Sequence, residues 1–221
     1  SYKKKGNAMK TTQYILGLVL SIMTAELEAQ TPVWVQQMGG KGVDVGTAIA
    51  VDGFGNVYTA GTFSGTADFD PGPDTFNMTT AGAADIFITK LDASGRFIWA
   101  KQFKGSGEDY VSAIAVDEVG NVYTTGHFVD TVDFDPGDGQ RILISAGRAD
   151  AFISKLDANG NHIWVGKFGG TNNVRSNALV LDGSGYLYIA GEFEGGADFD
   201  PGVTGYFAFS AGAVDAFITK L

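Results

Sequence analysis

One sequence unit occurs three times in this chain, at a fixed spacing of 65 residues. The motif Asp-Phe-Asp-Pro-Gly begins at Asp68, at Asp133 (133 − 68 = 65) and at Asp198. Three tryptophans keep the same spacing: Trp34, Trp99 and Trp164. A long, constant period means that one supersecondary unit stacks on copies of itself, because a single copy cannot bury its apolar face alone. The repeat therefore constrains the architecture of the chain more than its function.

Each unit is expected to form short strands joined by tight turns. In the first unit, stretches rich in β-forming residues predict four strands, at 34–38, 47–51, 57–63 and 86–91. Asp52-Gly53-Phe54-Gly55-Asn56 is typical of the turns, in which glycine supplies the positive φ that a hairpin needs. A total of 32 glycines and 16 phenylalanines fits many short strands and turns.

Four antiparallel strands per unit predict an all-β fold, a β-propeller built of four-stranded antiparallel blades. Radial packing buries both faces of a blade, which explains why the strands are almost continuously apolar. A β-solenoid is the alternative, but its coils are usually shorter and lack hairpin turns. The three blades are expected at about 31–91, 92–156 and 157–221.

The first part of the chain predicts a secretory signal peptide at 9–29. Met9-Lys10 is followed by an apolar run from Tyr14 to Met23 that is too short to span a bilayer, and cleavage is expected after Ala29. An uncleaved anchor is the alternative, and residues 1–8 are interpreted as upstream sequence. After cleavage we expect a secreted or cell-surface protein without a membrane span.

The charge balance excludes two classes of partner. Residues 30–221 carry 11 basic and 23 acidic side chains, a net charge of −12. This charge repels phosphate backbones and anionic lipid, so neither nucleic acid nor a membrane surface is an expected partner. The chain has no cysteine, so disulfides cannot contribute to its stability.

The sequence also resembles a known family. The stretch from Gly46 to Tyr58, followed by 85–92 and by Ile98-Trp99, is similar to SBBP, a bacterial β-propeller repeat. It resembles in particular the form with Asp-Phe-Asp-Pro-Gly loops found in secreted surface proteins of the Bacteroidetes. The resemblance covers 31–221 and implies a propeller fold and an extracellular location. It implies no particular activity, because a fold alone does not define a function.

The paired aspartates of the repeated motif are the candidate metal ligands. The pairs are Asp68 and Asp70, Asp133 and Asp135, and Asp198 and Asp200. The residue before a proline is extended, so both carboxylates of a pair are expected on one face, with Phe69 turned toward the core. Hard oxygen ligands of this kind suit Ca²⁺. Alternatively, each aspartate caps a turn by accepting backbone N–H bonds. Pro71-Gly72 predicts a type II turn.

Other candidate residues favour structural roles. Thr62 and Glu192 occupy the place of His127 in the other units, which predicts a tolerant, exposed position. The recurring tryptophans could stack on sugar rings, but their place within strands favours packing between blades. An active site is normally built once, whereas each attractive carboxylate here occurs three times. With no nucleophile elbow, phosphate loop or zinc signature, the chain is not expected to be an enzyme.

The sequence therefore predicts a non-catalytic scaffold or adhesion module that binds protein or glycan through loops at the blade ends. The alternatives are a carbohydrate-active enzyme or its accessory domain, and a self-assembling surface protein. The chain opens with a strand of the fourth type near Trp34 and stops after one of the third type at Leu221. Propellers typically need four to eight blades to close. We therefore expect either further blades in a longer protein, the favoured reading, or copies that complete each other, for example two chains giving six blades.

Overall fold

The structure, a computed structural model, describes residues 31–202 and 204–221. Its compact part is Trp34–Leu221. The regular elements of these described residues are 18 strands, which confirms the all-β prediction. No helix in the described residues has the length and apolar character needed to cross a membrane. The signal peptide predicted at 9–29 lies outside the described residues.

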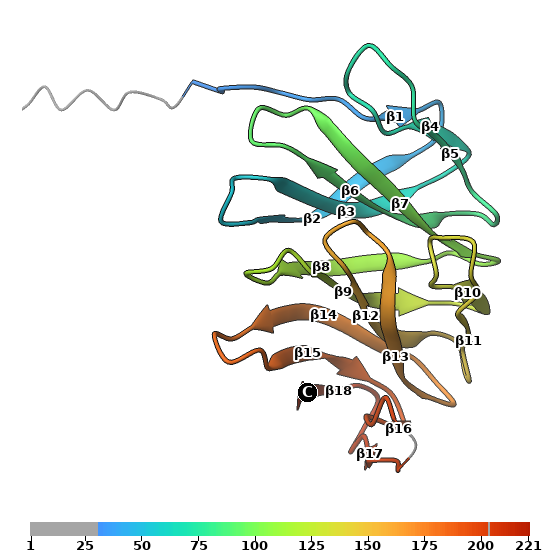
Figure 1. The fold of residues 1–221 in the computed structure, drawn as a ribbon. Helices are drawn as coiled ribbons and strands as arrows, with labels where there is room; N and C mark the ends of the chain where they lie inside the picture. Colours follow the sequence, from blue (N-terminus) through green and yellow to red (C-terminus); the bar gives the residue numbers. More distant parts are fainter. Residues whose placement is uncertain (1–30, 203) are drawn as a thin grey trace, which may run out of the picture. The chain divides into compact units, whose positions relative to one another are not determined.

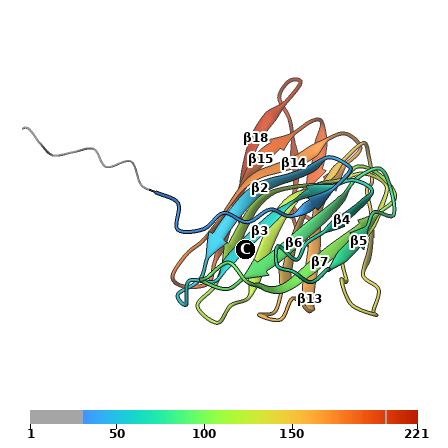
Figure 2. The same ribbon diagram turned by 90° about the horizontal axis from the view of Figure 1, so that it is seen from above.

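The described residues form four antiparallel sheets, three of which contain the blades that follow one another along the chain as a stack (Figure 1). Blade 1 contains, in spatial order, β2 (Asp44–Val51), β3 (Val57–Phe63), β6 (Asp85–Leu91) and β7 (Phe97–Gly105). Blade 2 contains β8 (Tyr110–Val116), β9 (Val122–Phe128), β12 (Asp150–Leu156) and β13 (His162–Gly170). Blade 3 contains β14 (Val174–Leu181), β15 (Leu187–Phe193) and β18 (Asp215–Lys220). Seen from above, the blades overlie one another (Figure 2).

A short extra hairpin in each unit carries the Asp-Phe-Asp-Pro-Gly motif. The hairpins are β4 (Thr66–Asp68) with β5 (Asn77–Thr79), β10 (Thr131–Asp133) with β11 (Ile142–Ile144), and β16 (Gly196–Asp198) with β17 (Phe207–Phe209). The second and third hairpins pair with the outer strands of the preceding blades, β10 with β7 and β16 with β13, whereas β4 of the first hairpin pairs with β1. These hairpins therefore tie neighbouring blades together. The sequence did not predict them, because strands of three residues are too short to show a period.

The predicted strand at 34–38 is wrong. Only β1 (Gly39–Gly40) is extended enough to pair, and it pairs with β4. The repeats of this segment, in β7 and β13, pair along β6 and β12. Within the residues that the structure describes, no strand equivalent to β6 or β12 lies beside 34–38. The backbone N–H and C=O groups of this segment therefore have no neighbouring strand to pair with. Each four-stranded blade thus takes its outer strand from the next repeat, and the sheets do not close into a ring.

The hydrophobic core lies between the blades. One cluster joins Tyr58, Ile86 and Ile88 of blade 1 to Phe128 and Phe152 of blade 2. A second cluster repeats this arrangement between blades 2 and 3. The motif phenylalanines are buried, as predicted: Phe134 and Phe199, 0% and 7% exposed, enter these two clusters, and Phe69, 1% exposed, enters a third cluster at blade 1. Most apolar burial in this fold is therefore shared between neighbouring repeats.

Replacing Phe134 by alanine tests this packing. The Phe134 ring lies within 5.5 Å, centroid to centroid, of the rings of Phe103, Phe128 and Phe152. Its removal should lower the free energy of unfolding by about 3–5 kcal/mol. The matched control is Phe54→Ala, because Phe54 is 84% exposed, and its change should stay within about 0.5 kcal/mol. Urea denaturation followed by tryptophan fluorescence measures both; equal effects would contradict the description of the core.

Candidate functional site

The motif carboxylates cap their own loops. Asp68 Oδ1 accepts bonds from Asp70 N at 3.1 Å and from Phe76 N at 2.8 Å. Asp70 Oδ1 accepts a bond from Gly72 N at 2.7 Å. The same bonds recur in the second and third motifs, at Asp133 and Asp135 and at Asp198 and Asp200. Turn capping, one of the two alternatives weighed for these residues, is therefore present at all three motifs.

The type II turn predicted at Pro71-Gly72 is wrong. That turn requires a positive φ at the glycine, and Gly72 is not among the residues with positive φ. The Asp70 carboxylate accepts the Gly72 N–H and so takes the place of a backbone carbonyl in the turn. A side chain that closes the turn removes the need for an unusual backbone angle.

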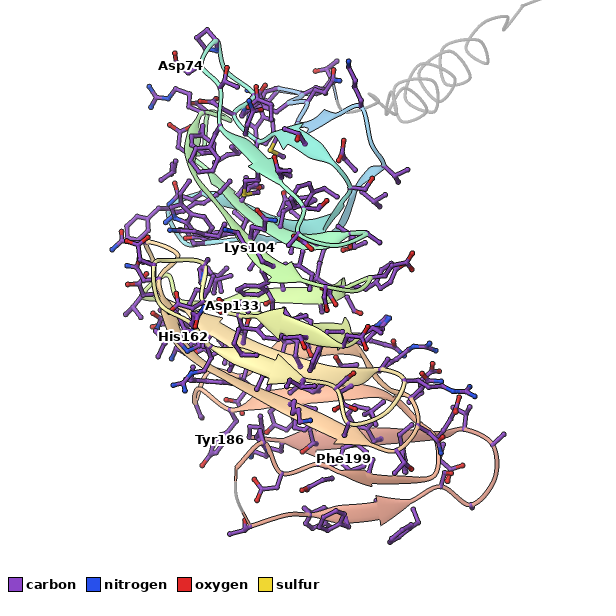
Figure 3. All side chains as sticks on the ribbon, turned by 90° about the vertical axis from the view of Figure 1, so that its right-hand side faces the viewer. Asp74, Lys104, Asp133, His162, Tyr186 and Phe199 are labelled. Carbon is purple, nitrogen blue, oxygen red and sulfur yellow. The ribbon has the colours of Figure 1, made fainter. Side chains whose placement is uncertain are left out.

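The motif hairpins leave a limited set of oxygen donors for a cation. Asp74, Asp133 and Phe199, one from each hairpin, follow one another along the stack (Figure 3). No group of three or more His, Cys, Asp or Glu side chains in 31–202 and 204–221 is placed to hold a metal ion. Each pair therefore offers its Oδ2 atoms and turn carbonyls, which is fewer carboxylates than Ca²⁺ sites commonly use. Calcium binding at the six aspartates stays a prediction.

The third loop differs from the other two. Asp200 Oδ2 accepts bonds from Gly205 N and from the Thr204 hydroxyl. The bond from Thr204, followed by that from Gly202 N, lowers the pKa of Asp200 below its usual value. This carboxylate is therefore already satisfied on both oxygens. If the motifs bind a cation, the third should bind it most weakly.

A buried acid lies at the boundary between blades 1 and 2. Asp109 is 0% exposed, and its Oδ1 accepts a bond from Val129 N at 3.2 Å. Its Oδ2 has no hydrogen-bond partner. Burial raises the pKa of Asp109 to about 7, and the negative charges of Asp85 and Asp130 add to the rise. Asp109 therefore holds a proton at mildly acidic pH.

Its neighbour Asp85 is fully satisfied. Asp85 is also 0% exposed and accepts bonds from Ala81 N, Gly105 N and the Gln102 side chain. An added Cβ at Gly105 would overlap Asp109 Oδ2, so this glycine leaves the space in which the second carboxyl fits. If both carboxyls were ionised, two negative charges would be buried beside the neutral amide of Gln102. Protonation of one carboxyl leaves a single buried charge.

The boundary between blades 2 and 3 solves the same problem with a cation. Asp150, the repeat of Asp85, pairs with Lys167 Nζ at 3.0 Å. Lys167 stands where blade 1 has Gln102, and Val174 stands where blade 2 has Asp109. Both positions therefore change together, and neither boundary buries more than one carboxylate that lacks a cationic partner. The sequence analysis missed these buried acids, although the paired change from Gln102 and Asp109 to Lys167 and Val174 was a signal that could have revealed them.

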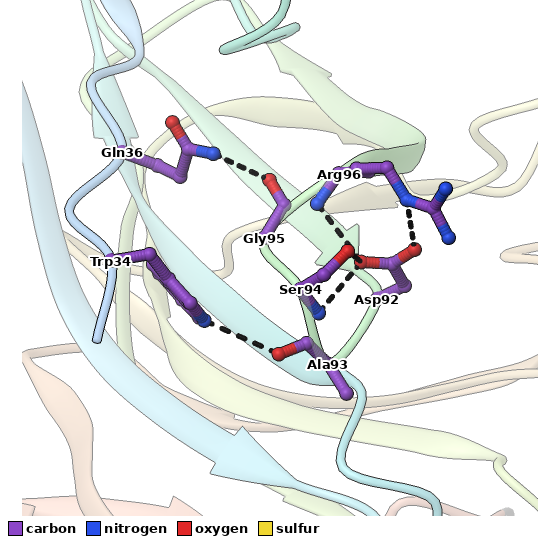
Figure 4. A network of polar contacts seen from close by, with 7 residues as sticks. All are labelled: Trp34, Gln36, Asp92, Ala93, Ser94, Gly95 and Arg96. Atoms are coloured by element: carbon purple, nitrogen blue, oxygen red, sulfur yellow. Dashed lines mark hydrogen bonds and ion pairs between the residues drawn. The ribbon is translucent and has the colours of Figure 1, made fainter.

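Two of the tryptophans donate hydrogen bonds to turns of the following unit. Trp34 Nε1 donates to Ala93 O at 3.2 Å, and Gln36 Nε2 donates to Gly95 O at 2.9 Å (Figure 4). Trp99 Nε1 donates to Ala158 O at the same distance of 3.2 Å. These bonds link Trp34 and Trp99 to a following turn, and Trp164 packs against the core between blades 2 and 3, which confirms the predicted packing role.

The hairpin turns within and between blades are closed by hydrogen bonds to an aspartate side chain. Asp52 Oδ1 accepts bonds from Phe54 N and Asn56 N, and Gly55 has φ +81. Burial favours the neutral acid, but the bonds from Asn56, Phe54 and Tyr58 outweigh it and lower the pKa of Asp52. Glycines with positive φ stand at the same place in the other four turns, at Gly95, Gly120, Gly160 and Gly185. The predicted hairpin turns are confirmed.

The expectation that His127 is exposed is wrong. Its ring stacks on Tyr110 at 5.1 Å, and burial followed by the positive charge of Arg175 lowers its pKa to about 4. The position varies among repeats because each blade boundary supplies a different neighbour, not because the side chain is free in solvent. A neutral, half-buried imidazole packs there as an aromatic ring.

The turns that join the first two strands of each blade, at 52–56, 117–121 and 182–186, are here called the inner turns. A groove of about 610 Å³ opens between the inner turns of blades 2 and 3. One wall is Ala115–Val119, and the other runs from Leu179 to Gly185. Val119 and Val180 are 75% and 61% exposed, while Asp117 and Asp182 are engaged in capping their own turns. The groove is therefore largely apolar, with the free carboxylate of Glu118 on its first wall.

Comparisons with known proteins agree with this architecture. The family model described as SBBP, a beta-propeller repeat, matches residues 33–68 and 98–127. The resemblance to SBBP seen in the sequence is therefore confirmed for these segments.

Two curated relatives are more distant. The chain is 24% identical over 186 residues to "Uncharacterized WD repeat-containing protein L264" of Acanthamoeba polyphaga mimivirus, a match covering 74% of this chain and 13% of that protein. It is 24% identical over 110 residues to "Regulatory protein FlaEY" of Caulobacter vibrioides, covering 50% of this chain and 12% of that protein. The chain thus spans a small part of either relative.

Calcium binding is tested by the double variant Asp133→Asn with Asp135→Asn. Asparagine keeps an oxygen that accepts the capping N–H bonds but removes the two charges. If the motif binds Ca²⁺, saturating Ca²⁺ should raise the Tm of the wild-type chain, and the variant should show a smaller rise, because binding to the native state alone stabilises it. The control is the pair at Asp198 and Asp200, whose replacement should matter least. A Tm that does not change when EDTA is added to calcium-loaded protein would leave only the capping role.

Asp109 should make stability depend on pH. The unfolded chain releases this proton near pH 3.9, whereas the folded chain retains it up to about pH 7. The folded state binds more protons between these values, so the free energy of unfolding should fall as pH rises through this window. A shift of about three pKa units corresponds to an upper limit of about 4 kcal/mol.

Asp109→Asn removes the titrating group, so its free energy of unfolding should not fall over this pH range. Compared with the wild type, this variant should therefore gain stability on going from pH 4 to pH 8, and so should Asp109→Val, which copies Val174. Asp74→Asn, at an exposed loop position, is the matched control and should keep the wild-type profile. Urea denaturation at a series of pH values measures all four proteins. Parallel profiles for wild type and Asp109→Asn would show that Asp109 holds no proton in this range.

Proposed function

We propose that this chain is a secreted, non-catalytic β-propeller module that binds protein or glycan through its inner turns, as a scaffold or adhesion surface. The observation that carries the proposal is a rigid frame with variable tips. The capping aspartates Asp52, Asp117 and Asp182 recur with the same bonds, whereas the residues at the tips, Phe54, Val119 and Ser184, differ. Binding residues are commonly found on loops that a rigid scaffold positions.

Exposure of the tips supports this role. Phe54 and Val119 are 84% and 75% exposed, which removes them from any role in the core of the blades. Val119 lies on the wall of the groove, and Phe54 is at the same position in the turn of blade 1. Exposed aromatic and apolar side chains of this kind supply contact area for a sugar ring or an apolar side chain. Glu118 on the wall of the groove and the net charge of −12 in 30–221 favour a neutral or cationic ligand over an anionic one.

The rival function, a carbohydrate-active enzyme, has less support. Asp85 and Asp109 are the neighbouring carboxyls that most resemble a general acid and its partner, since one pKa is raised. Both are 0% exposed, so a substrate cannot reach them. The other repeated carboxylates are engaged in capping turns. These features favour a binding module.

A glycan and protein array probed with matched variants tests the proposal. The double variant Phe54→Ser with Val119→Ser gives both turns the tip residue that Ser184 already provides in blade 3. It should weaken binding by about tenfold or more, since loss of central contact residues commonly costs over 1 kcal/mol. Ile144→Ser, on a 61% exposed residue of the β11 hairpin, should leave binding unchanged.

Two outcomes would contradict the proposal. Equal binding by the tip variant and the Ile144 variant would place the ligand elsewhere, and release of reducing sugar from any bound polysaccharide would make the chain an enzyme.

A further inference from the structure

The face of each blade that is directed toward the next blade, here called the distal face, is open only in blade 3. Ile88, Ile153 and Ile218 occupy the same position of the repeat on this face. Ile88 and Ile153 are 1% and 0% exposed, because the following blade covers them, whereas Ile218 is 81% exposed. Val180, on β14 of the same blade, is 61% exposed. Blade 3 thus presents an interface surface without its usual neighbour among the described residues.

The opposite face of blade 1, its proximal face, is open in the same way. Ile49 is 69% exposed, whereas its repeats Ile114 and Leu179 are 8% and 9% exposed because the preceding blade covers them. Val51 of the same strand is 61% exposed, whereas its repeats Val116 and Leu181 pack against the cores between blades. Blade 1 therefore exposes a proximal face, which is the kind of surface that packs against a distal face such as that of blade 3.

The two open faces are the two halves of one repeating interface. Between blades 1 and 2, distal residues such as Ile86 and Ile88 pack against proximal residues such as Ile114, Phe134 and Phe152. The proximal half of this core is already assembled at blade 1, where Phe63, Phe69 and Phe87 cluster with Met38. The distal half is present on blade 3. Since the repeat has a constant period, the geometry that joins blades 1 and 2 can also join blade 3 to a second blade 1.

The strand edges are complementary as well. In the residues that the structure describes, β18 pairs with β15 alone, whereas its repeats β6 and β12 have strands on both sides. Segment 34–38 precedes β1 and is the repeat of the outer strands, yet it has no ladder. It is held in place by the bonds from Trp34 and Gln36 to the turn 92–96 (Figure 4). An unpaired edge and an unpaired strand of the matching type are a template for pairing between chains.

A lysine on the distal face is already oriented for the contact. Lys90 Nζ lies 4.9 Å from the centre of the Tyr58 ring and donates to Ala158 O of the next unit. Lys220 Nζ lies 5.1 Å from the ring of Tyr188, the repeat of Tyr58, and 3.8 Å from the ring of Tyr186, which stands where blade 1 has Asn56. By the repeat, its acceptor is Ala93 O of a blade 1 placed after blade 3.

We propose that a second copy of this chain covers these surfaces head to tail: the distal face of blade 3 docks on the proximal face of blade 1 of the next copy, and segment 34–38 of that copy pairs with β18. The contact is heterologous, because it joins two different surfaces. This self-association goes beyond the proposed binding function and does not use the tip residues, although Val180 of the distal face also lines the groove.

Two charge-introducing variants test the proposal on the full chain. Ile218→Asp blocks the distal face, and Ile49→Asp blocks the proximal face. Both side chains are exposed, so neither change should alter the circular dichroism spectrum or the cooperativity of melting. Sedimentation velocity across a range of concentrations should show wild-type association, weakened by at least about tenfold in each variant.

Mixing the two variants separates this contact from any other. Each variant keeps the face that the other has lost, so an equal mixture should form a one-to-one complex although each alone is monomeric. Ile144→Ser, on an exposed hairpin outside both faces, should associate like the wild type.

A wild-type chain that stays monomeric would overturn the proposal and would leave the faces to a further segment of a longer protein. Variants that still associate alone, or a mixture that stays monomeric, would also overturn it.

Discussion

The packing of one blade on the next is the interaction on which this structure depends. A single blade is one sheet thick and apolar on both faces, so it can remove its side chains from water only against a neighbour. The same residue is 0% or 1% exposed where a neighbour is present and 81% exposed where none lies beside it, as Ile153, Ile88 and Ile218 show. Between blades 1 and 2, the Trp99 bond, the pairing of β10 with β7 and the bond from Lys90 to Ala158 O all cross the boundary and fix the register of this packing.

The boundaries share a shape but differ in charge. The first holds two buried carboxyls beside a glutamine, and the second holds one carboxylate beside a lysine. Removing an ion from water is costly, so a proton at Asp109 and an ammonium group at Lys167 are two ways to satisfy one constraint. The tips of the inner turns vary more freely, because Phe54 and Val119 contribute nothing to the core. The residues that stabilise the fold are therefore separate from the tip residues at which we propose binding.

Much of this fold could be predicted from the sequence, and the failures have physical causes. The period, the glycine turns and the packing role of the tryptophans are local or repetitive features that a sequence states directly. The strand at 34–38 failed because a strand needs a neighbour, which local composition does not reveal. The motif hairpins were too short to show a period. The type II turn was displaced by the Asp70 side chain, which competes with the backbone for the Gly72 N–H.

The candidate sites were harder to predict. Asp109 and His127 are defined by residues far away in the chain, Asp85 and Arg175 among them. Such environments follow from how the blades stack, so no spacing within one repeat indicates them. The six motif aspartates were identified as a chemical feature, and the capping role weighed for them is present in the structure, while their affinity for a cation is a property that geometry alone does not supply.

Native-state hydrogen exchange, with the chain diluted until it is monomeric, tests the central claim most directly. If blades are stabilised mainly by their neighbours, the slowest amides should lie in β9 and β12, whose blade is covered on both faces, and the amides of β18 should exchange much faster despite the nearly identical sequence of β6, β12 and β18. Equal protection of the three strands would contradict this account, because it would mean that each blade is stable by itself.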